Sequence, residues 1–389
     1  MSVPQWIGYC TNVHAGVTLE QTRANLQEHA VRVRQLVSAD QPIGVGLWLS
    51  AEAARSLRAT ENGVAEFRAW LSDNQLMPYT LNGFPYGDFH QEVVKLEVYK
   101  PTWMQRERLD YTLDLVAILD GLLPPGDEGS ISTVPITWGQ PVVEEEKLQA
   151  AAAHLRELAS HLETLEKESG RLIYLCIEPE PGCVIDTTDD MIAFFKTYLM
   201  NQDDAEMMAR YIRVCHDVCH AAVMFEDQST VLEKYAAAGI AVGKVQVSSA
   251  IEVDFESLSS EEKSAALERL SQFAEDKYMH QTSTRSPAGE TVLHYDLPDL
   301  LKLAEAGEYL DCMWRIHFHM PIYLQEFGEL KTTQSHILDL LNAGDLIQSI
   351  RHWEVETYAW GVLPAELQHE QLSDGIAKEI CWLKDQLKG

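Results

Sequence analysis

The stretch LIYLCIEPE, residues 172–180, is an apolar run that ends in two glutamates. The same arrangement recurs in YIRVCHDVCH (211–220) and HWEVETYAW (352–360), where acidic and imidazole side chains follow the apolar residues. Short apolar runs of this length are typical of buried strands in a parallel sheet. When such a sheet closes into a barrel, the carboxyl ends of its strands meet on one face, where barrel active sites lie. We therefore expect these polar side chains to gather in one site.

Five more apolar runs complete a series of eight. They are WIGYCTNVH (6–14), IGVGLWLS (43–50), LMPYTLNGFP (76–85), SISTVPITW (130–138) and VGKVQVSSA (242–250). Helical signals separate the runs: Thr18 and Gln21 have capping-box spacing, and an apolar stripe from Leu148 to Leu165 stops near Gly170. No GxGxxG or GxxxxGK[ST] loop follows any run, which favours a closed barrel over an open doubly wound sheet. The sequence predicts one α/β domain over residues 1–389, a (β/α)8 TIM barrel.

The seventh and eighth runs are separated by an insertion of about a hundred residues, 251–351. It contains a charged helical stretch (258–275), a second one near 297–306, and the apolar run WRIHFHMPIY (314–323). Barrel active sites are built from loops on this face, so we expect a lid-like insertion that faces the substrate. The alternative is that the apolar run forms a ninth strand of the barrel.

Composition limits the possible partners and location. The net charge of −30 and the pI near 4.7 oppose binding to nucleic acid. No run reaches the roughly 18 to 20 apolar residues of a membrane span, and the first residues do not resemble a secretory signal, so we expect a cytoplasmic protein. Seven cysteines scattered through apolar segments indicate reduced thiols, and we assign Cys215 and Cys219 to packing.

The ends of the fifth and sixth runs carry the first candidate metal ligands. Glu178 is the better candidate in LCIEPEPG, because Pro179 interrupts regular pairing before Glu180. Either glutamate could instead be an exposed loop residue. The spacing of Asp217 and His220 lets a carboxylate and an imidazole reach one ion from the strand end and the turn after it. A helix cap or a satisfied core group is the alternative for these two.

Alternation along a strand puts His317 with His319, and Glu354 with Glu356, on a shared face. Buried carboxylates are costly unless they bind a cation or pair with a base, although one member of each pair could lie on a solvated surface. The amide of Gln246 is a weaker donor and could instead hold a substrate hydroxyl. The predicted site for a divalent ion (Mn, Zn, Mg or Co) comprises Glu178, Asp217, His220, Gln246, His317, His319, Glu354 and Glu356.

A rim of aromatic and hydrogen-bonding residues is expected to bind a small polyol or sugar phosphate. The candidates are Asn12, His14, Asn82, Tyr86, His90, Trp138, His280, Gln281 and Arg285. Of these, His14 could also be a structural hydrogen-bonding residue. The sequence does not predict an oligomeric state.

The order of polar residues at the last four strands resembles the xylose isomerase-like barrels, which include sugar isomerases, epimerases and a metal-dependent endonuclease. More narrowly, YCTNVH, NGFPYGDFH, LCIEPEPGC, HDVCHAAVMFED, KVQVSSA, YMHQT and HWEVETYAW are similar to the metabolite traffic protein EboE group. The wider resemblance implies a metal held by Glu178, Asp217, Gln246 and Glu356, with the two glutamates as acid and base. It also implies that His220 polarises a substrate oxygen. The chain departs from the family at Gln246, where an imidazole is expected, unless His317 or His319 supplies that ligand.

These expectations favour a divalent-metal sugar, sugar-phosphate or cyclitol isomerase or epimerase. The EboE resemblance implies a place in a biosynthetic and export-related gene set and a cyclitol or sugar-phosphate substrate. Two alternatives remain open: metal-assisted hydrolysis of a phosphoester, which two or three bound ions would favour, and a metabolite carrier without catalytic activity.

Overall fold

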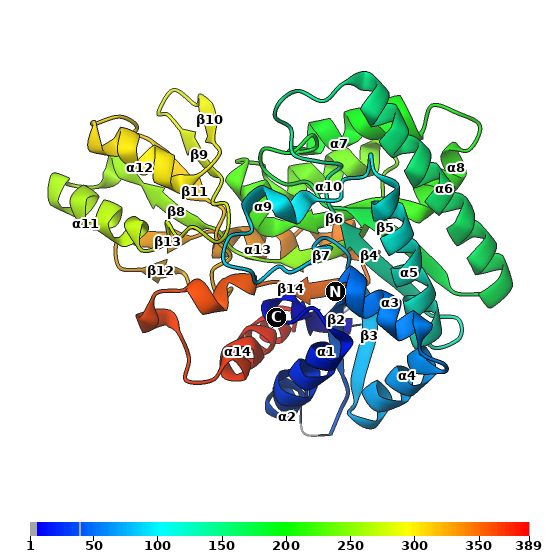
Figure 1. Ribbon diagram of the computed structural model, residues 1–389. Helices are drawn as coiled ribbons and strands as arrows, with labels where there is room; N and C mark the ends of the chain where they lie inside the picture. The colour runs from blue at the N-terminus through cyan, green and yellow to red at the C-terminus, as the bar shows by residue number, and fades with distance from the viewer. Residues whose placement is uncertain (1–5, 39, 389) are drawn as a thin grey trace.

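Eight parallel strands form the core of the computed structural model, which describes residues 6–38 and 40–388 (Figure 1). Residues 1–5, 39 and 389 of the expected 1–389 unit lie outside the described part. The barrel strands are β1 (Trp6–Tyr9), β2 (Ile43–Trp48), β3 (Leu76–Asn82), β4 (Glu128–Thr133), β5 (Leu172–Ile177), β6 (Ile212–Asp217), β7 (Val242–Val247) and β14 (His352–Val355). Their order is β1-β14-β7-β6-β5-β4-β3-β2, and a parallel bridge between Cys10 and Gly46 links β1 to β2. The predicted (β/α)8 barrel and its eight strand positions are confirmed.

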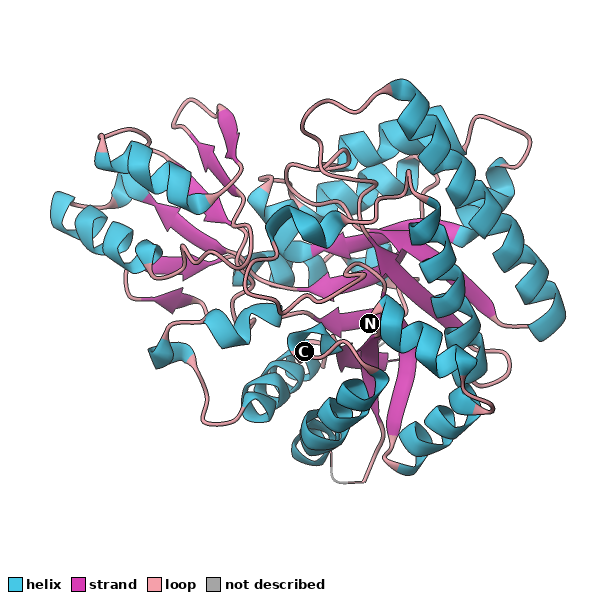
Figure 2. Ribbon diagram, in the orientation of Figure 1, coloured by secondary structure: helices cyan, strands magenta, loops and turns pink. Residues whose placement is uncertain are grey.

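Helices surround the barrel (Figure 2). They are α1 (Leu19–Asn25), α2 (Val31–Val37), α3 (Ala51–Ala59), α4 (Gly63–Asp73), α5 (Arg106–Leu122), α6 (Glu145–Ser169), α7 (Thr188–Phe194), α8 (Ala205–Tyr211), α9 (Val218–Val223), α10 (Gln228–Ala237), α13 (Gln334–Leu341) and α14 (Leu372–Gln386). The capping box of Thr18 and Gln21 begins α1 as predicted, because each side chain accepts a backbone N–H of the other residue. Gly170 ends α6 in the left-handed conformation, at φ 72°, which glycine adopts without a steric cost.

The insertion after β7 forms a second sheet, which is antiparallel throughout and stands beside the barrel (Figures 1 and 2). Its strands are β8 (Ile251–Asp254), β9 (Thr282–Arg285), β10 (Thr291–His294), β11 (Met313–Ile316), β12 (Glu326–Phe327) and β13 (Leu330–Thr332), and its helices are α11 (Ser260–Ser271) and α12 (Leu297–Glu305). The run 314–323 begins as β11 of this sheet, so the alternative of a ninth barrel strand does not occur. Helix α13, at the end of the expected insertion, packs against α9 and α10 in the helical layer of the barrel.

The path of the chain after β11 brings the insertion onto the carboxyl face of the barrel. The N–H of His317 donates to Gln281 O at 2.8 Å, and the N–H of Met320 donates to Ser249 O, just after β7, at 2.8 Å. Residues 317–319 therefore lie between the second sheet and the barrel. No helix in the described part of the chain has both the length and the apolar character of a transmembrane span.

Candidate metal centre

Three carboxylates converge at the carboxyl ends of the barrel strands β5, β6 and β14. Glu178 follows β5, Asp217 ends β6 and Glu356 follows β14, and one oxygen of each lies within 4.8 Å of the others. The three residues are 3%, 2% and 5% exposed. Among the described residues, Oε2 of Glu178 and Oδ2 of Asp217 find no hydrogen-bond partner. Because buried, unsatisfied carboxylates are costly, this donor set fits a divalent cation.

The pKa values of the three acids reflect this crowding. Burial, followed by the charges of Glu356 and Asp217, raises the pKa of Glu178 well above its usual value. Burial, followed by the charges of Asp217 and Glu354, raises the pKa of Glu356 to about 8. Burial opposes ionisation of Asp217 as well, but His220, His319 and the hydrogen bonds from the His220 N–H and the Ser248 hydroxyl lower its pKa overall. The site thus holds one stable carboxylate between two acids that resist ionisation without a cation.

His319 presents an imidazole nitrogen to this group. Its Nδ1 lies 2.6 Å from Glu356 O, and because a carbonyl only accepts, Nδ1 carries the proton and Nε2 carries a lone pair. That Nε2 lies 3.9 Å from Asp217 Oδ2 and finds no hydrogen-bond partner among the described residues. Burial lowers the pKa of His319 to about 4, so the ring is neutral near pH 7. Donation of the other ring N–H to an oxygen is the usual arrangement of a metal-binding histidine.

A second group of possible ligands lies beside the first. It comprises Glu180, His220 and His317, whose donor atoms lie within 4.8 Å of one another, and His220 also groups with Asp217 and His319. Nε2 of His220 lies 3.1 Å from Nε2 of His317. Glu180 is buried and accepts hydrogen bonds from Tyr99 Oη at 2.8 Å and Gln281 Nε2 at 3.1 Å. The alternative of an exposed loop glutamate therefore does not hold for Glu180.

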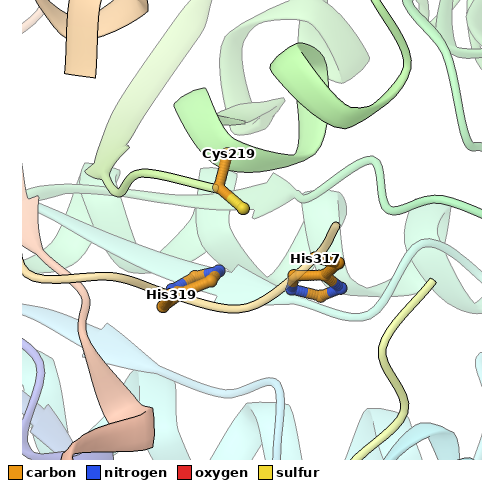
Figure 3. Close-up of side chains that lie close together, drawn as sticks. All are labelled: Cys219, His317 and His319. Atoms are coloured by element: carbon orange, nitrogen blue, oxygen red, sulfur yellow. The ribbon is translucent and has the colours of Figure 1, made fainter. Parts of the chain in front are cut away.

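Cys219, at the start of α9, points toward the imidazoles of His317 and His319 (Figure 3). Burial, followed by the charges of Asp217, Glu356 and Glu180, raises the pKa of its thiol well above the usual value. A protonated thiol is a poor metal ligand. All seven cysteines are free in the structure, as the sequence predicts for reduced thiols.

Gln246 and Glu354 lie on neighbouring strands, paired in register across β7 and β14. The amide of Gln246 is buried, and neither its oxygen nor its nitrogen finds a hydrogen-bond partner among the described residues. Oε2 of Glu354 instead lies 2.6 Å from Nζ of Lys244, and both side chains are fully buried. Gly46 makes room for this carboxylate, because a Cβ there would sit 1.2 Å from Glu354 Oε1. The structure thus places Glu354 in an ion pair and not in the two ligand groups.

A cavity with about 540 Å³ of unfilled space, its open mouth included, leads to both groups. Its polar end is lined by Glu178, Glu180, Glu356, His220, His317 and His319. Asn12 and Asn82 also line it, and their Nδ2 atoms donate to Glu356 Oε1 at 2.9 and 3.0 Å.

Three predicted rim residues lie directly behind the cavity wall. Gln281 Nε2 donates to Glu180, and its Oε1 lies 2.8 Å from His317 Nδ1. His280 Nε2 lies 3.0 Å from Glu275 Oε1, and His90 Nε2 lies 2.6 Å from Asn12 O. The structure therefore places these residues where they support cavity residues.

Four other predicted rim residues do not themselves line the cavity. His14 stacks on His29 at 4.4 Å between ring centroids, and Trp138 packs between Tyr99 and Tyr295. The ring of Tyr86 packs edge-on against Tyr111. Arg285 lies over the ring of Phe225, with its guanidinium carbon 4.1 Å from the centroid.

The sequence reasoning did not single out several apolar and aromatic residues that line the cavity. They are Phe84, Pro85, Phe89, Val94, Val98, Tyr99, Tyr278, Met279 and Tyr358, together with Lys95. Phe89 and Tyr278 lie one and two residues from predicted rim residues, His90 and His280, so their proximity to the rim was the available signal.

Comparison of the whole fold with solved structures defines its class. The chain is similar to a xylose isomerase-like TIM barrel protein from Mycobacterium smegmatis in complex with magnesium, with TM-score 0.53 and 12% identity over 99% of this chain and 97% of that chain. It is also similar to a D-tagatose 3-epimerase-like protein, with TM-score 0.50 and 11% identity over 98% and 97% of the two chains. No family model and no curated protein matches the chain. This likeness shows the fold alone, a (β/α)8 barrel.

Proposed function

We propose that this protein is a divalent-metal-dependent isomerase or epimerase that acts on a small sugar or cyclitol. The observation that carries the proposal is the buried group of Glu178, Asp217 and Glu356. Oε2 of Glu178 and Oδ2 of Asp217 find no hydrogen-bond partner among the described residues, and Glu178 and Glu356 line the cavity. The similar solved structures, one with magnesium and one epimerase-like, support it. The narrower resemblance to the EboE group and a cytoplasmic location belong to the same proposal.

The ion would be held by the three carboxylates and by Nε2 of His319. In this ligand set the insertion supplies the imidazole that the resemblance expects at Gln246. His319 is the better choice because its Nε2 lies 3.9 Å from Asp217 Oδ2 and its ring is held by the Nδ1 hydrogen bond to Glu356 O. When bound, a divalent ion polarises a carbonyl and the hydroxyl next to it.

Glu178 and Glu356 would move the proton at the neighbouring carbon, one as base and the other as acid. Asn12 and Asn82 donate to Oε1 of Glu356 and so hold its carboxylate in one orientation. Nδ1 of His220 lies 2.8 Å from Pro179 O, which only accepts, so Nδ1 carries a proton there and Nε2 is the ring nitrogen that could accept a hydrogen bond from a substrate hydroxyl.

Solvent exchange at carbon tests this chemistry directly. The metal-loaded protein is incubated with a panel of ketoses, aldoses and keto-cyclitols in deuterated water, and recovered substrate is analysed by mass spectrometry. A carboxylate base exchanges its abstracted proton at least partly with solvent, so deuterium should appear at the carbon beside the carbonyl. Glu178→Gln should abolish incorporation, whereas Glu168→Gln, on the exposed face of α6, should retain it.

The second group of ligands favours metal-assisted phosphoester hydrolysis as the alternative, because Glu180, His220 and His317 could hold a further ion. Elemental analysis of protein purified without chelator separates the two functions. One ion per chain with carbon exchange supports the isomerase. Two or three ions with phosphate release and no exchange support the hydrolase, and tight polyol binding with neither reaction supports a carrier.

A further inference from the structure

The cavity changes character along its length. The metal-binding end is polar, whereas the remaining wall comes from the loop after β3, from residues 278–279 of the insertion and from Tyr358. The rings of Phe89, Tyr278 and Tyr358 form a triangle here, with centroids 5.1, 5.3 and 5.2 Å apart. We define this apolar passage by Phe84, Phe89, Val94, Val98, Tyr278, Met279 and Tyr358.

The apolar passage is continuous with the metal-binding end. The ring of Tyr358 lies 4.7 Å from that of His319, and Tyr99, which packs beside Phe84, donates its hydroxyl to Glu180. Beyond the passage, Val93 and Leu96 expose 51% and 39% of their surfaces to solvent. Apolar surface therefore runs from beside the proposed ligands to the exterior.

The charges along the cavity do not suit a phosphorylated substrate. Among the described residues that line it, Glu178, Glu180 and Glu356 are acidic, and Lys95 is the one lysine or arginine. Nζ of Lys95 is already paired with Asp296 Oδ2 at 2.7 Å. Phosphate recognition ordinarily uses arginine, lysine or a helix N-terminus.

We propose that the substrate is an amphiphile: a hydroxylated head that reaches the proposed metal site and an uncharged alkyl or aryl substituent that fills the apolar passage. This inference rests on the proposed function. An unsubstituted polyol would leave the passage in contact with water, and a phosphate ester would place two negative charges beside a wall without an available cation. Burial of an alkyl or aryl group in the passage removes apolar surface from water on both partners.

Hydroxamates test the passage without knowledge of the head group's stereochemistry, because every hydroxamate offers the same chelating head to a divalent ion. The probes are acetohydroxamate, hexanohydroxamate and phosphoglycolohydroxamate, titrated by calorimetry into Mn(II)-loaded protein. Hexanohydroxamate should bind at least about tenfold more tightly than acetohydroxamate. Burial of about two of the extra methylenes of hexanohydroxamate is enough for this gain. Phosphoglycolohydroxamate should bind no more tightly than acetohydroxamate.

The variant Val98→Asp should reduce the gain from the alkyl tail at least about fivefold, because it places a charge on the passage wall. Val98→Thr, which nearly preserves shape, should retain most of the gain. An equal affinity for the acetyl and hexanoyl probes, an unchanged gain in Val98→Asp, or tightest binding by the phosphate probe would overturn the inference and leave the proposed function standing. If none of the three binds the Mn(II)-loaded protein, the proposed metal site fails, and this inference fails with it. The comparison of probes needs only the wild-type chain and so does not depend on the folding of any variant.

Discussion

Nε2 of His220 and Nε2 of His317 face one another at 3.1 Å, and both are unprotonated when the rings are neutral. The reason is that Nδ1 of each ring lies 2.8 Å from an oxygen that only accepts, Pro179 O for His220 and Gln281 Oε1 for His317. Gln281 is oriented by its Nε2, which donates to Glu180 and to Pro181 O. Two lone pairs at this distance repel unless a cation lies between them.

We predict that His317→Gln changes the stability of the metal-free protein and its affinity for metal in opposite directions. In EDTA, the Tm of the variant should equal or exceed that of wild type, because an amide N–H can donate to His220. With Zn(II), affinity should fall at least about tenfold, and the rise in Tm should be smaller. Thermal unfolding in both conditions measures this, with His294→Gln on β10 as the matched control. An unchanged response to Zn(II) would show that the pair does not bind the ion.

Asp217→Asn and Glu356→Gln should each lower Mn(II) or Zn(II) affinity by about tenfold or more, which is about 1.4 kcal/mol. Each change removes a negative ligand and keeps the side-chain volume, so the barrel should still fold. Calorimetry gives the affinity, and circular dichroism checks the fold. Unchanged affinity in both variants would contradict the assignment of these strand-end acids as ligands.

Gln246→His should tighten metal binding, since imidazole is a stronger donor than an amide. A double variant tests this prediction more directly, because His319 already offers an imidazole beside Asp217. His319→Ala should weaken Zn(II) binding, and Gln246→His in the same chain should restore part of it. If Gln246→His has no effect in either background, then Gln246 does not reach the ion.

Glu354→Gln should lower the free energy of unfolding by about 3–5 kcal/mol, because it leaves the buried charge of Lys244 unpaired. Chemical denaturation measures the loss. The double variant Lys244→Met with Glu354→Gln should recover part of it, since no uncompensated charge remains. A large loss of metal affinity in folded Glu354→Gln, with little loss of stability, would instead make Glu354 a ligand.

Glu379 on α14 gives a pH dependence that is separate from the metal site. Its carboxylate accepts hydrogen bonds from Thr357 Oγ1, the Ile322 N–H and Trp360 Nε1, but burial outweighs them and raises its pKa from 4.5 to about 7. Because the folded state binds this proton more tightly than the unfolded chain, the group's contribution to stability is lost as pH rises from about 4.5 to 7.

Glu379→Gln removes this titration. The free energy of unfolding of the variant minus that of wild type should therefore increase by roughly 3 kcal/mol between about pH 4 and pH 8. Urea denaturation in EDTA across this range measures the difference, and Glu370→Gln on the surface serves as the control. A difference that does not change with pH would mean that Glu379 titrates normally.

The sequence predicts the barrel well because each strand has a local signal, an apolar run followed by polar residues. The same logic predicted Glu178, Asp217 and Glu356 at one site, and in the structure one oxygen of each lies within 4.8 Å of the others. The pattern does not specify, however, how deep inside the barrel each side chain lies. Glu354 comes two residues before Glu356, which places it about 6.6 Å further from the carboxyl end of the strand. At that depth the nearest partner is Lys244, and only the packed barrel brings the two together.

The second sheet could not be predicted in the same way. Its strands pair across long separations, as β8 does with β11, and alternation within one strand does not specify a partner. His14, Tyr86, Trp138 and Arg285 are not among the described residues that line the cavity, for a related reason. Each is anchored by a ring or cation contact with a residue that sequence proximity does not identify, such as His29 for His14.

Because His319 follows β11, whereas the three carboxylates stand at barrel strands, the proposed ligand set is divided between two separately hydrogen-bonded sheets. An ion bound there would cross-link the barrel to the insertion, so its removal should speed amide hydrogen exchange in residues 313–320 more than in β5 or β6.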